Sequence, residues 1–237
     1  NEKTIEDAVR SVLSQSYQDI EYIIIDGKSS DRTNEKIKKY ISNIDIYISE
    51  RDMGIYDAMN KGVNLASGDI LGILNSDDIY YDNEVISDVV SEFKKNKDLN
   101  IVYGNLVYVE TENTDKVIRK WRSKNYYSKF FEQGNVPPHP ALFVRREVYN
   151  ECGLFNWNYK LAADYDFMLR IFKKFGYSSK YVPRLMVKMR LGGATNKSIK
   201  NIIKGNKEII KSWKSNGLKA PLMLMPRRLF KRLIQFV

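Results

Sequence analysis

Three short apolar runs, separated by helical patterns, place the strongest constraint on how this chain can fold. The runs cover residues 20–25, 44–48 and 70–74, and amphipathic helices are predicted at 4–16, 29–40, 54–66 and 82–95. Continuous apolar runs of this length are typical of strands buried on both faces. Strands that alternate with helices at this spacing form βαβ units. The sequence therefore predicts an α/β fold, Rossmann-like, with a mostly parallel sheet flanked by helices.

The order of these elements lacks one expected strand. A doubly wound sheet normally opens with a strand, whereas Asn1 leads directly into the helix predicted at 4–16. We therefore expect a first strand ahead of Asn1 in the natural protein, absent from this chain. Its absence is expected to leave a gap in the sheet beside any nucleotide pocket.

Acidic residues follow each of the three apolar runs. Asp26 ends the first run, Asp52 follows the second, and Asp77 and Asp78 follow the third. In open α/β sheets, ligands bind beyond the carboxyl ends of the strands. Adjacent carboxylates repel unless a cation lies between them, and the chain has no glycine-rich phosphate loop. We therefore expect Mg²⁺ or Mn²⁺, held by one or two carboxylates and by substrate phosphates.

The net charge of +10 is concentrated near the carboxyl end. Residues 201–237 carry nine basic side chains against one acidic one, a net charge of +8, which leaves +2 for residues 1–200. A basic tail on a nearly neutral body, without a recognised binding motif, argues against a nucleic-acid-binding protein. The single Cys152 cannot form an internal disulfide, and with one histidine it cannot complete a zinc cluster. These features favour a reducing cytoplasm.

Seven motifs in order resemble the signatures of family 2 glycosyltransferases with a GT-A fold. They are Ser-Gln-Ser-Tyr at 14–17, Ile-Asp-Gly-Lys-Ser-Ser-Asp at 25–31, the segment 52–62, Leu-Asn-Ser-Asp-Asp at 74–78, the segment 139–146, Ala-Ala-Asp-Tyr-Asp at 162–166, and Arg-Leu-Gly-Gly at 190–193. The resemblance covers about residues 1–195. It is closest to the branch that builds capsules and exopolysaccharides.

The resemblance implies roles for the strand-end carboxylates. Asp26 and Asp52 would contact the base or ribose of a nucleotide-sugar, and Asn60 would join them at the donor site. Asp77 and Asp78 occupy the position of the family's DxD motif, with Asp78 the expected metal ligand and Asp77 nearer the ribose. Two departures are visible. Many members have a second Asp where Gly27 stands, and the metal motif is Ser-Asp-Asp, with Ser76 in place of a leading Asp, which is common in this family but leaves fewer protein ligands.

Asp164 is the predicted catalytic base. Met168, Ile171 and Phe175 follow it at i+4, i+7 and i+11, so a helical projection puts all four on one inward face, and Asp166 points elsewhere. An inward carboxylate in the first turn also gains from the helix dipole. A purely structural first-turn Asp is therefore the alternative.

Two cationic or titratable residues join the expected donor site. Arg190 precedes a Gly-Gly pair, and the resemblance implies that its loop closes over the phosphates, which an Arg can hold with paired hydrogen bonds. His139, the only histidine, could contact the diphosphate or acceptor, or could be a satisfied core residue. An aromatic group could form an acceptor platform or belong to the core, and it consists of Trp121, Tyr126, Tyr127, Phe130 and Phe131.

The implied reaction is an inverting transfer of a sugar from a nucleotide-diphosphate sugar to a saccharide or lipid-linked acceptor in surface polysaccharide synthesis. Asp164 would take the proton of the acceptor hydroxyl as that oxygen attacks the anomeric carbon. A nucleotidyltransferase acting on a sugar phosphate also uses a Rossmann-like sheet with paired acids and is the alternative. Such an enzyme normally has a basic, glycine-rich loop near its start.

Three segments are expected along the chain. Residues 1–100 form the nucleotide-sugar-binding half, residues 101–195 the acceptor-binding and catalytic half, and residues 196–237 a basic helical tail. From residue 227 onward, a helical projection separates a basic side from an apolar side. Such a helix suits an anionic membrane surface, which predicts a peripheral protein on the inner face of the plasma membrane. A helix docked on the body or on a partner is the alternative.

Overall fold

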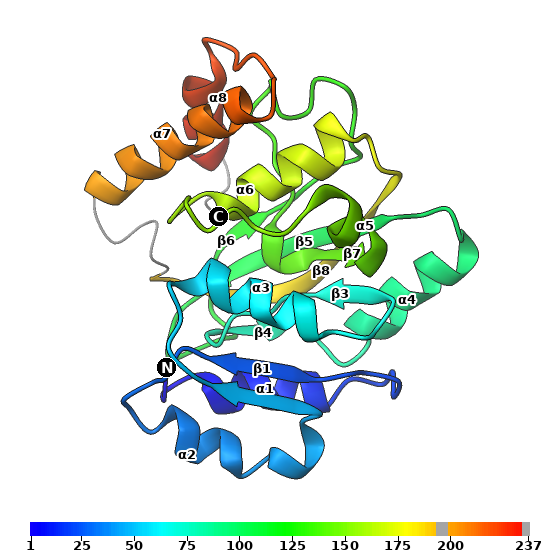
Figure 1. The fold of residues 1–237 in the computed structure, drawn as a ribbon, viewed down its shortest axis with the longest axis vertical. Coiled ribbons are helices and arrows are strands. Elements are labelled where there is room, and N and C mark those ends of the chain that lie inside the picture. Colours follow the sequence, from blue (N-terminus) through cyan, green and yellow to red (C-terminus); the bar gives the residue numbers. More distant parts are fainter. Residues whose placement is uncertain (193–198, 234–237) are drawn as a thin grey trace.

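The computed structural model describes residues 1–192 and 199–233 and has an α/β architecture. Its centre is a sheet in the order β3-β7-β5-β8-β4, with β6 paired to β5 (Figure 1). The strands are β3 (Ile70–Gly72), β4 (Asp78–Tyr80), β5 (Ile101–Val109), β6 (Val117–Trp121), β7 (Leu142–Arg145) and β8 (Ser179–Arg190). Every residue of β5 is buried, as expected of a strand covered on both faces.

The predicted α/β class is confirmed, but the central sheet is mixed rather than mostly parallel. Only β5 and β8 run parallel in it, and the other four pairings are antiparallel. Alternation of strands and helices indicates the fold class without specifying which strands become neighbours. The neighbours are chosen by packing between segments that are far apart in the sequence.

Residues 5–49 add a second, smaller layer. β1 (Ile23–Asp26) and β2 (Ile46–Ser49) form a parallel pair, accompanied by α1 (Ile5–Leu13), α2 (Thr33–Lys38) and the short turn η1 (Ile41–Asn43). Its small core contains Ile5, Val9, Ile37 and Ile44. In Figure 1 this layer lies below the central sheet, and α7 and α8 lie at the opposite end of the molecule.

β1 and β3 are not paired with each other in the described structure. One cavity is lined by residues 23–25 of the first layer and by residues 70–73 of the central sheet. An apolar opening therefore separates the two layers. The strand expected ahead of Asn1 stays a prediction.

Helices cover the central sheet and carry the candidate site. They are α3 (Ile55–Leu65), α4 (Val85–Lys95), the 3₁₀ turn η2 (His139–Ala141), α5 (Arg146–Cys152) and α6 (Ala163–Met168), which continues into a π-helical segment, η3 (Leu169–Lys174). The aromatic group divides between core and surface: Phe130 and Phe131 are fully buried, and Tyr126 and Tyr127 pack against them. The core interpretation therefore holds for these four rings.

The π-helical segment changes the face that follows Asp164. Met168 and Ile171 are buried as predicted, but Phe175 is 47% exposed. A π-helix has more residues per turn than an α-helix, so side chains beyond it are rotated away from the face that a 3.6-residue period predicts. The prediction that all four residues share one inward face was wrong at Phe175 for this reason.

The basic tail is docked on the body as two helices, α7 (Ile199–Ser215) and α8 (Leu224–Leu233). The Trp213 indole donates to the Tyr165 hydroxyl at 2.9 Å, and Asn216 donates to Asp166 at 2.8 Å. Glu208 accepts hydrogen bonds from the backbone of residues 160 and 161. These buried polar contacts support the docked-helix alternative for α7, and residues 234–237 lie outside the described residues. None of the described helices is both long and apolar enough to span a bilayer.

Candidate active site

Asp26 is held rigidly at the carboxyl end of β1. The Ser29 hydroxyl and backbone amide donate to its two oxygens at 2.5 and 3.0 Å, and the Ser49 hydroxyl donates at 2.6 Å. Burial opposes ionisation, but these hydrogen bonds prevail and lower the pKa of Asp26. The side chain is therefore an oriented carboxylate, and it lines the large cavity.

Asp52 reaches the same cavity from the loop after β2, directly against Gly27. A Cβ placed on Gly27 would lie 2.3 Å from Oδ2 of Asp52, and the other carboxylate oxygen accepts from the Gly54 amide at 2.9 Å. A side chain at residue 27 would therefore displace this carboxylate. The departure from the family pattern at Gly27 is explained by the position of Asp52.

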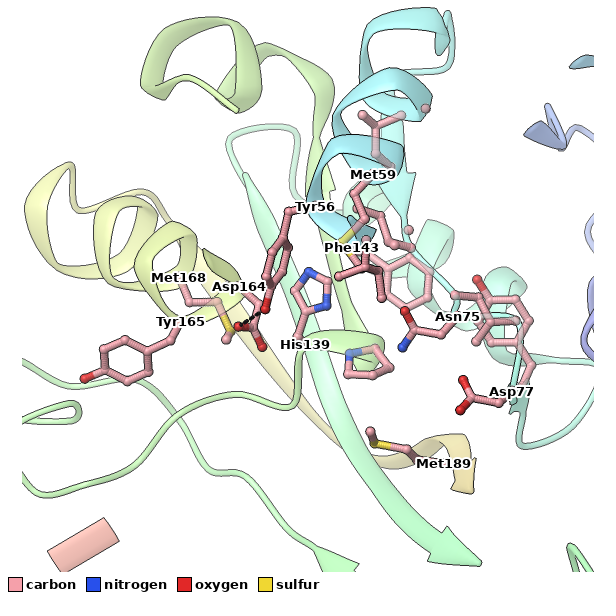
Figure 2. A pocket seen from close by; sticks show the side chains of 18 of the residues that line it. Tyr56, Met59, Asn75, Asp77, His139, Phe143, Asp164, Tyr165, Met168 and Met189 are labelled. Atoms are coloured by element: carbon pink, nitrogen blue, oxygen red, sulfur yellow. Dashed lines mark hydrogen bonds between the residues drawn. The ribbon is translucent and has the colours of Figure 1, made fainter. Parts of the chain in front are cut away.

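Asp77 and Asp78 differ sharply in their surroundings. Asp77 is half-buried and lines the cavity (Figure 2), whereas Asp78 begins β4 with 1% of its surface exposed. Oδ2 of Asp78 accepts from the Asn75 amide at 2.9 Å, and its Oδ1 is buried with no hydrogen-bond partner among the described residues. Burial first, and the charge of Asp77 second, raise the pKa of Asp78 to about 7. The geometry thus favours Asp77, rather than the expected Asp78, as the residue that faces a ligand.

The oxygen atoms near Asp77 fit a hard divalent cation. Within the described ranges, no three His, Cys, Asp or Glu side chains converge closely enough to hold a metal by themselves. Mg²⁺ is commonly bound by one or two carboxylates completed by substrate phosphates, so a sparse protein donor set suits it. The unpartnered Oδ1 of Asp78 is an acceptor that a nearby cation would stabilise.

Arg190 does not present its guanidinium to the cavity as a phosphate clamp. It is 4% exposed, and its nitrogens donate to the backbone carbonyls of Thr111 at 3.0 Å and Asp77 at 2.9 Å and to the Asp7 carboxylate at 2.5 Å. In the described structure Arg190 therefore holds the Asp77 loop and α1 in place. The expected contact with phosphates would require these bonds to be exchanged.

Asn60 is also directed away from the expected donor site. Its amide exchanges two hydrogen bonds, both of 2.9 Å, with the backbone of Phe155, and it does not line the cavity. This reciprocal pair joins α3 to the loop after α5. Asn60 therefore does not contact the donor site as expected, because its amide nitrogen and its amide oxygen both bond to the backbone of Phe155.

Asp164 lies in the first turn of α6, with Tyr56 and His139 beside it (Figure 2). The Tyr56 hydroxyl donates to Oδ1 of Asp164 at 3.0 Å, and Oδ2 accepts no hydrogen bond from the described residues. His139 is buried, its ring edge packs on Phe155, and burial lowers its pKa against the opposing charge of Asp164. Asp164 therefore offers one oriented oxygen and one available oxygen to the cavity.

Asp166 takes a structural role, in agreement with the helical projection. It is buried, forms an ion pair with Arg170 at 3.2 Å, and accepts from Asn216 of the chain after α7. It does not line the cavity. The two carboxylates of the 162–166 motif are thus separated into one that faces the cavity and one that anchors the tail.

A single cavity of about 2460 Å³ unites the site. It is lined by Asp26, Asp52, Asp77, His139, Asp164 and Arg190 among the expected residues, and it also reaches α8. Sequence reasoning did not place Tyr56 at the site, and it assigned the cations of α8 to a membrane surface rather than to this cavity. Tyr56 lies within the 52–62 motif, but no local spacing links it to a residue 108 positions away.

Comparison with known proteins agrees with this fold. The sequence model of "Glycosyl transferase family 2" matches residues 1–153. The chain therefore belongs to glycosyl transferase family 2. The membership does not favour the nucleotidyltransferase alternative.

Curated relatives carry related names. A "PGL/p-HBAD biosynthesis glycosyltransferase" of Mycobacterium bovis is 28% identical over 190 residues, which cover 78% of this chain and 72% of that protein. An "Uncharacterized glycosyltransferase" of Mycobacterium tuberculosis is 30% identical over 167 residues, or 68% of this chain and 61% of that protein.

Solved structures of TarS from S. aureus share the fold. The complex with UDP has a TM-score of 0.65 at 16% identity and covers 95% of this chain, which spans 65% of that TarS chain. The complex with UDP-GlcNAc has a TM-score of 0.62 at 15% identity, over 97% of this chain and 76% of that one. Together with the family match, this likeness identifies the fold as GT-A.

Proposed function

We propose that this chain transfers a sugar, with inversion, from a nucleotide-diphosphate sugar to a hydroxyl group of an acceptor. The observation that carries the proposal is that Asp164 lines the same cavity as Asp26, Asp52 and Asp77. A base and a row of strand-end carboxylates thus face one space. The UDP and UDP-GlcNAc complexes of the TarS structures support a nucleotide-sugar as donor.

The donor lies along the strand ends in this proposal. Asp26, kept ionised by Ser29 and Ser49, accepts hydrogen bonds from the base or ribose, and Asp52 contributes from its loop. Asp77, backed by Asp78, would hold Mg²⁺ or Mn²⁺, which offsets the charge that develops on the leaving nucleoside diphosphate. Arg190 supports Asp77 through its backbone carbonyl.

Asp164 acts on the acceptor. Oδ2 takes the hydroxyl proton while the hydroxyl oxygen forms a bond to the anomeric carbon and the bond from that carbon to the diphosphate breaks. Tyr56 keeps Oδ1 occupied, so the carboxylate is oriented with Oδ2 toward the cavity. Attack from the face opposite the leaving group inverts the anomeric configuration.

The test is hydrolysis or transfer with a panel of nucleotide-sugars in the presence of Mn²⁺ or Mg²⁺, with and without EDTA. We expect one nucleotide class to be consumed in a metal-dependent manner and Asp164→Asn to retain donor binding. A panel in which no nucleotide-sugar binds would contradict the proposal.

The tail and the family membership support a proposed pathway and location. We assign the chain to bacterial surface polysaccharide synthesis with a lipid-linked acceptor, as a peripheral protein on the cytoplasmic face of the plasma membrane. Exposed apolar side chains support this location, namely Leu222, Met223, Leu229 and Phe230, which is 65% exposed. Co-sedimentation with anionic vesicles should weaken as salt rises, and equal sedimentation after deletion of residues 218–237 would exclude the tail as the anchor.

A further inference from the structure

The cavity changes character beyond Asp164. Acidic residues line its donor side, whereas residues 119–136 and 225–231 contribute six cations and no carboxylate to the lining. The six are Arg119, Lys120, Arg122, Lys124, Arg228 and Lys231. An active site that is acidic at one end and basic at the other is suited to different chemical groups at its two ends.

α8 turns part of its basic side toward the body rather than outward. The Arg228 guanidinium lies over the Tyr165 ring, 4.7 Å from the ring centre, and Lys231 donates to Asn135 at 2.5 Å. Leu229 and Phe230 are exposed instead. The docking of α8 therefore brings two cations to the cavity that are remote from it in sequence.

The close approach of α8 depends on Gly134. A Cβ on this residue would lie 2.9 Å from the backbone nitrogen of Arg228 and 3.0 Å from the backbone carbon of Arg227. Its φ of +77° is also one that glycine adopts readily. The backbone of residue 134 thus forms part of the surface that holds α8 over the cavity.

Lys231 and Lys124 are near enough to repel each other. Burial first, and the charge of Lys124 second, lower the pKa of Lys231. No carboxylate within residues 1–192 and 199–233 forms an ion pair with either lysine. Both lysines line the cavity, and two like charges in one partly buried region are stabilised by an anion bound near them.

The basic end adjoins the proposed base. Tyr165, on which Arg228 stacks, follows Asp164 directly in α6, and its ring points away from the Asp164 carboxylate (Figure 2). Lys124, Arg228 and Lys231 line the same cavity as Asp164, so an acceptor whose hydroxyl reaches Asp164 can extend toward them. Apolar side chains of Val136 and Met225 line the same region.

We propose that this basic end, formed by Lys124, Arg228 and Lys231, binds a phosphate or diphosphate group of the acceptor. The inference rests on the proposed function, since it specifies the acceptor class of the same site. Charge-assisted hydrogen bonds from Lys and Arg are the strong contacts for phosphate. The phosphate can belong to a lipid carrier or to a soluble phosphate ester.

The test measures binding of farnesyl diphosphate, inorganic pyrophosphate and farnesol to the whole chain by calorimetry, below micelle-forming concentrations and with EDTA. Lys124→Gln and Lys231→Gln, singly and together, remove charge from the basic end. Arg227→Gln is the matched control, because Arg227 is exposed on the same helix and does not line the cavity. UDP binding with Mn²⁺ is measured in parallel, together with the thermal midpoint of each variant.

We expect the double variant to bind farnesyl diphosphate at least about tenfold more weakly, the equivalent of one charge-assisted hydrogen bond, and Arg227→Gln to bind it normally. Loss of pyrophosphate binding in parallel supports a site for phosphate itself, whereas a loss confined to farnesyl diphosphate supports a lipid phosphate. Unchanged affinity in the double variant, or affinity lost only in Asp77→Asn, would overturn the inference. Absence of UDP binding would instead count against the donor proposal. The farnesyl diphosphate result would still decide whether the basic end binds phosphate.

Discussion

Tyr56 in α3 and Asp164 in α6 are joined by a hydrogen bond of 3.0 Å between the phenol hydroxyl and Oδ1, across 108 residues of sequence. Burial and the adjacent carboxylate raise the pKa of Tyr56 well above its usual value, so the phenol remains a donor. This bond orients the carboxylate that the proposed reaction uses as its base.

Tyr56→Phe removes the donor while keeping the ring. We expect turnover to fall by about tenfold with the KM for the donor unchanged, because the carboxylate loses its orientation but donor contacts do not. Steady-state kinetics separate kcat from KM. A change confined to KM would show that Tyr56 acts on substrate binding instead.

The two aspartates of the 162–166 motif should respond oppositely to amide substitution. Asp164→Asn is expected to lower turnover by ~10² or more, as for loss of a general base, with nearly normal stability. Asp166→Asn is expected to cost about 3 kcal/mol of unfolding free energy, because it breaks a buried ion pair with Arg170. Turnover and urea denaturation of both variants check the assignment, and a reversed pattern would exchange the two roles.

Asp78→Asn should separate stability from ligand binding. Without metal at pH 8, the buried carboxylate is charged at a cost, since burial and Asp77 raise its pKa to about 7. In EDTA, we expect the free energy of unfolding of the variant to be about 1 kcal/mol higher than that of the unchanged chain. We also expect the variant to lose Mn²⁺-dependent UDP binding. Asp77→Asn is the comparison. We expect it to lose Mn²⁺-dependent UDP binding as well, but to gain little unfolding free energy. Normal Mn²⁺-dependent binding by both variants would remove this loop from the metal site.

His139 should make the folded chain sensitive to mild acid. Burial lowers its folded-state pKa, so as the pH falls below about 6.5 the unfolded chain binds more protons than the folded one. Unfolding free energy should therefore fall as pH drops below about 6.5, by at most about 1.4 kcal/mol per pH unit. Because His139 is the only histidine, His139→Gln should remove this component, as urea denaturation at pH 5.5 and 7.5 would show. An identical pH dependence in the variant would show that burial of His139 does not cause this loss of stability.

Gly134→Ala should disturb the docking of α8. The new Cβ would lie too close to the backbone of Arg227 and Arg228. Alanine is also less stable than glycine at the positive φ of this residue. Gly176→Ala is a matched control, because its φ is +72° and its Cβ would meet nothing within 4 Å. We expect about 1 kcal/mol of destabilisation from the control and more from Gly134→Ala, with faster hydrogen exchange in α8 only for the latter. Equal effects would show that α8 does not depend on this contact.

The sequence by itself determined the fold class and the row of carboxylates at the strand ends. Apolar runs, helical periods and the positions of Asp26, Asp52 and Asp77 are local features, and each depends on residues that are neighbours in the chain. The family motifs are equally local, which is why they identified a family that the comparisons then showed. The helical projection also separated Asp164 from Asp166 correctly, because the two share one regular turn.

Only the tertiary structure decided which partners these residues have. Asn60 and Arg190 belong to recognisable motifs, yet their polar groups are occupied by Phe155, Asp7 and the backbone of Asp77, which no spacing predicts. The π-helical segment rotated Phe175 outward, and Gly134 allowed α8 to bring its cations to the cavity. These outcomes depend on contacts between distant segments, whose energies are set by packing and burial rather than by the order of residues along the chain.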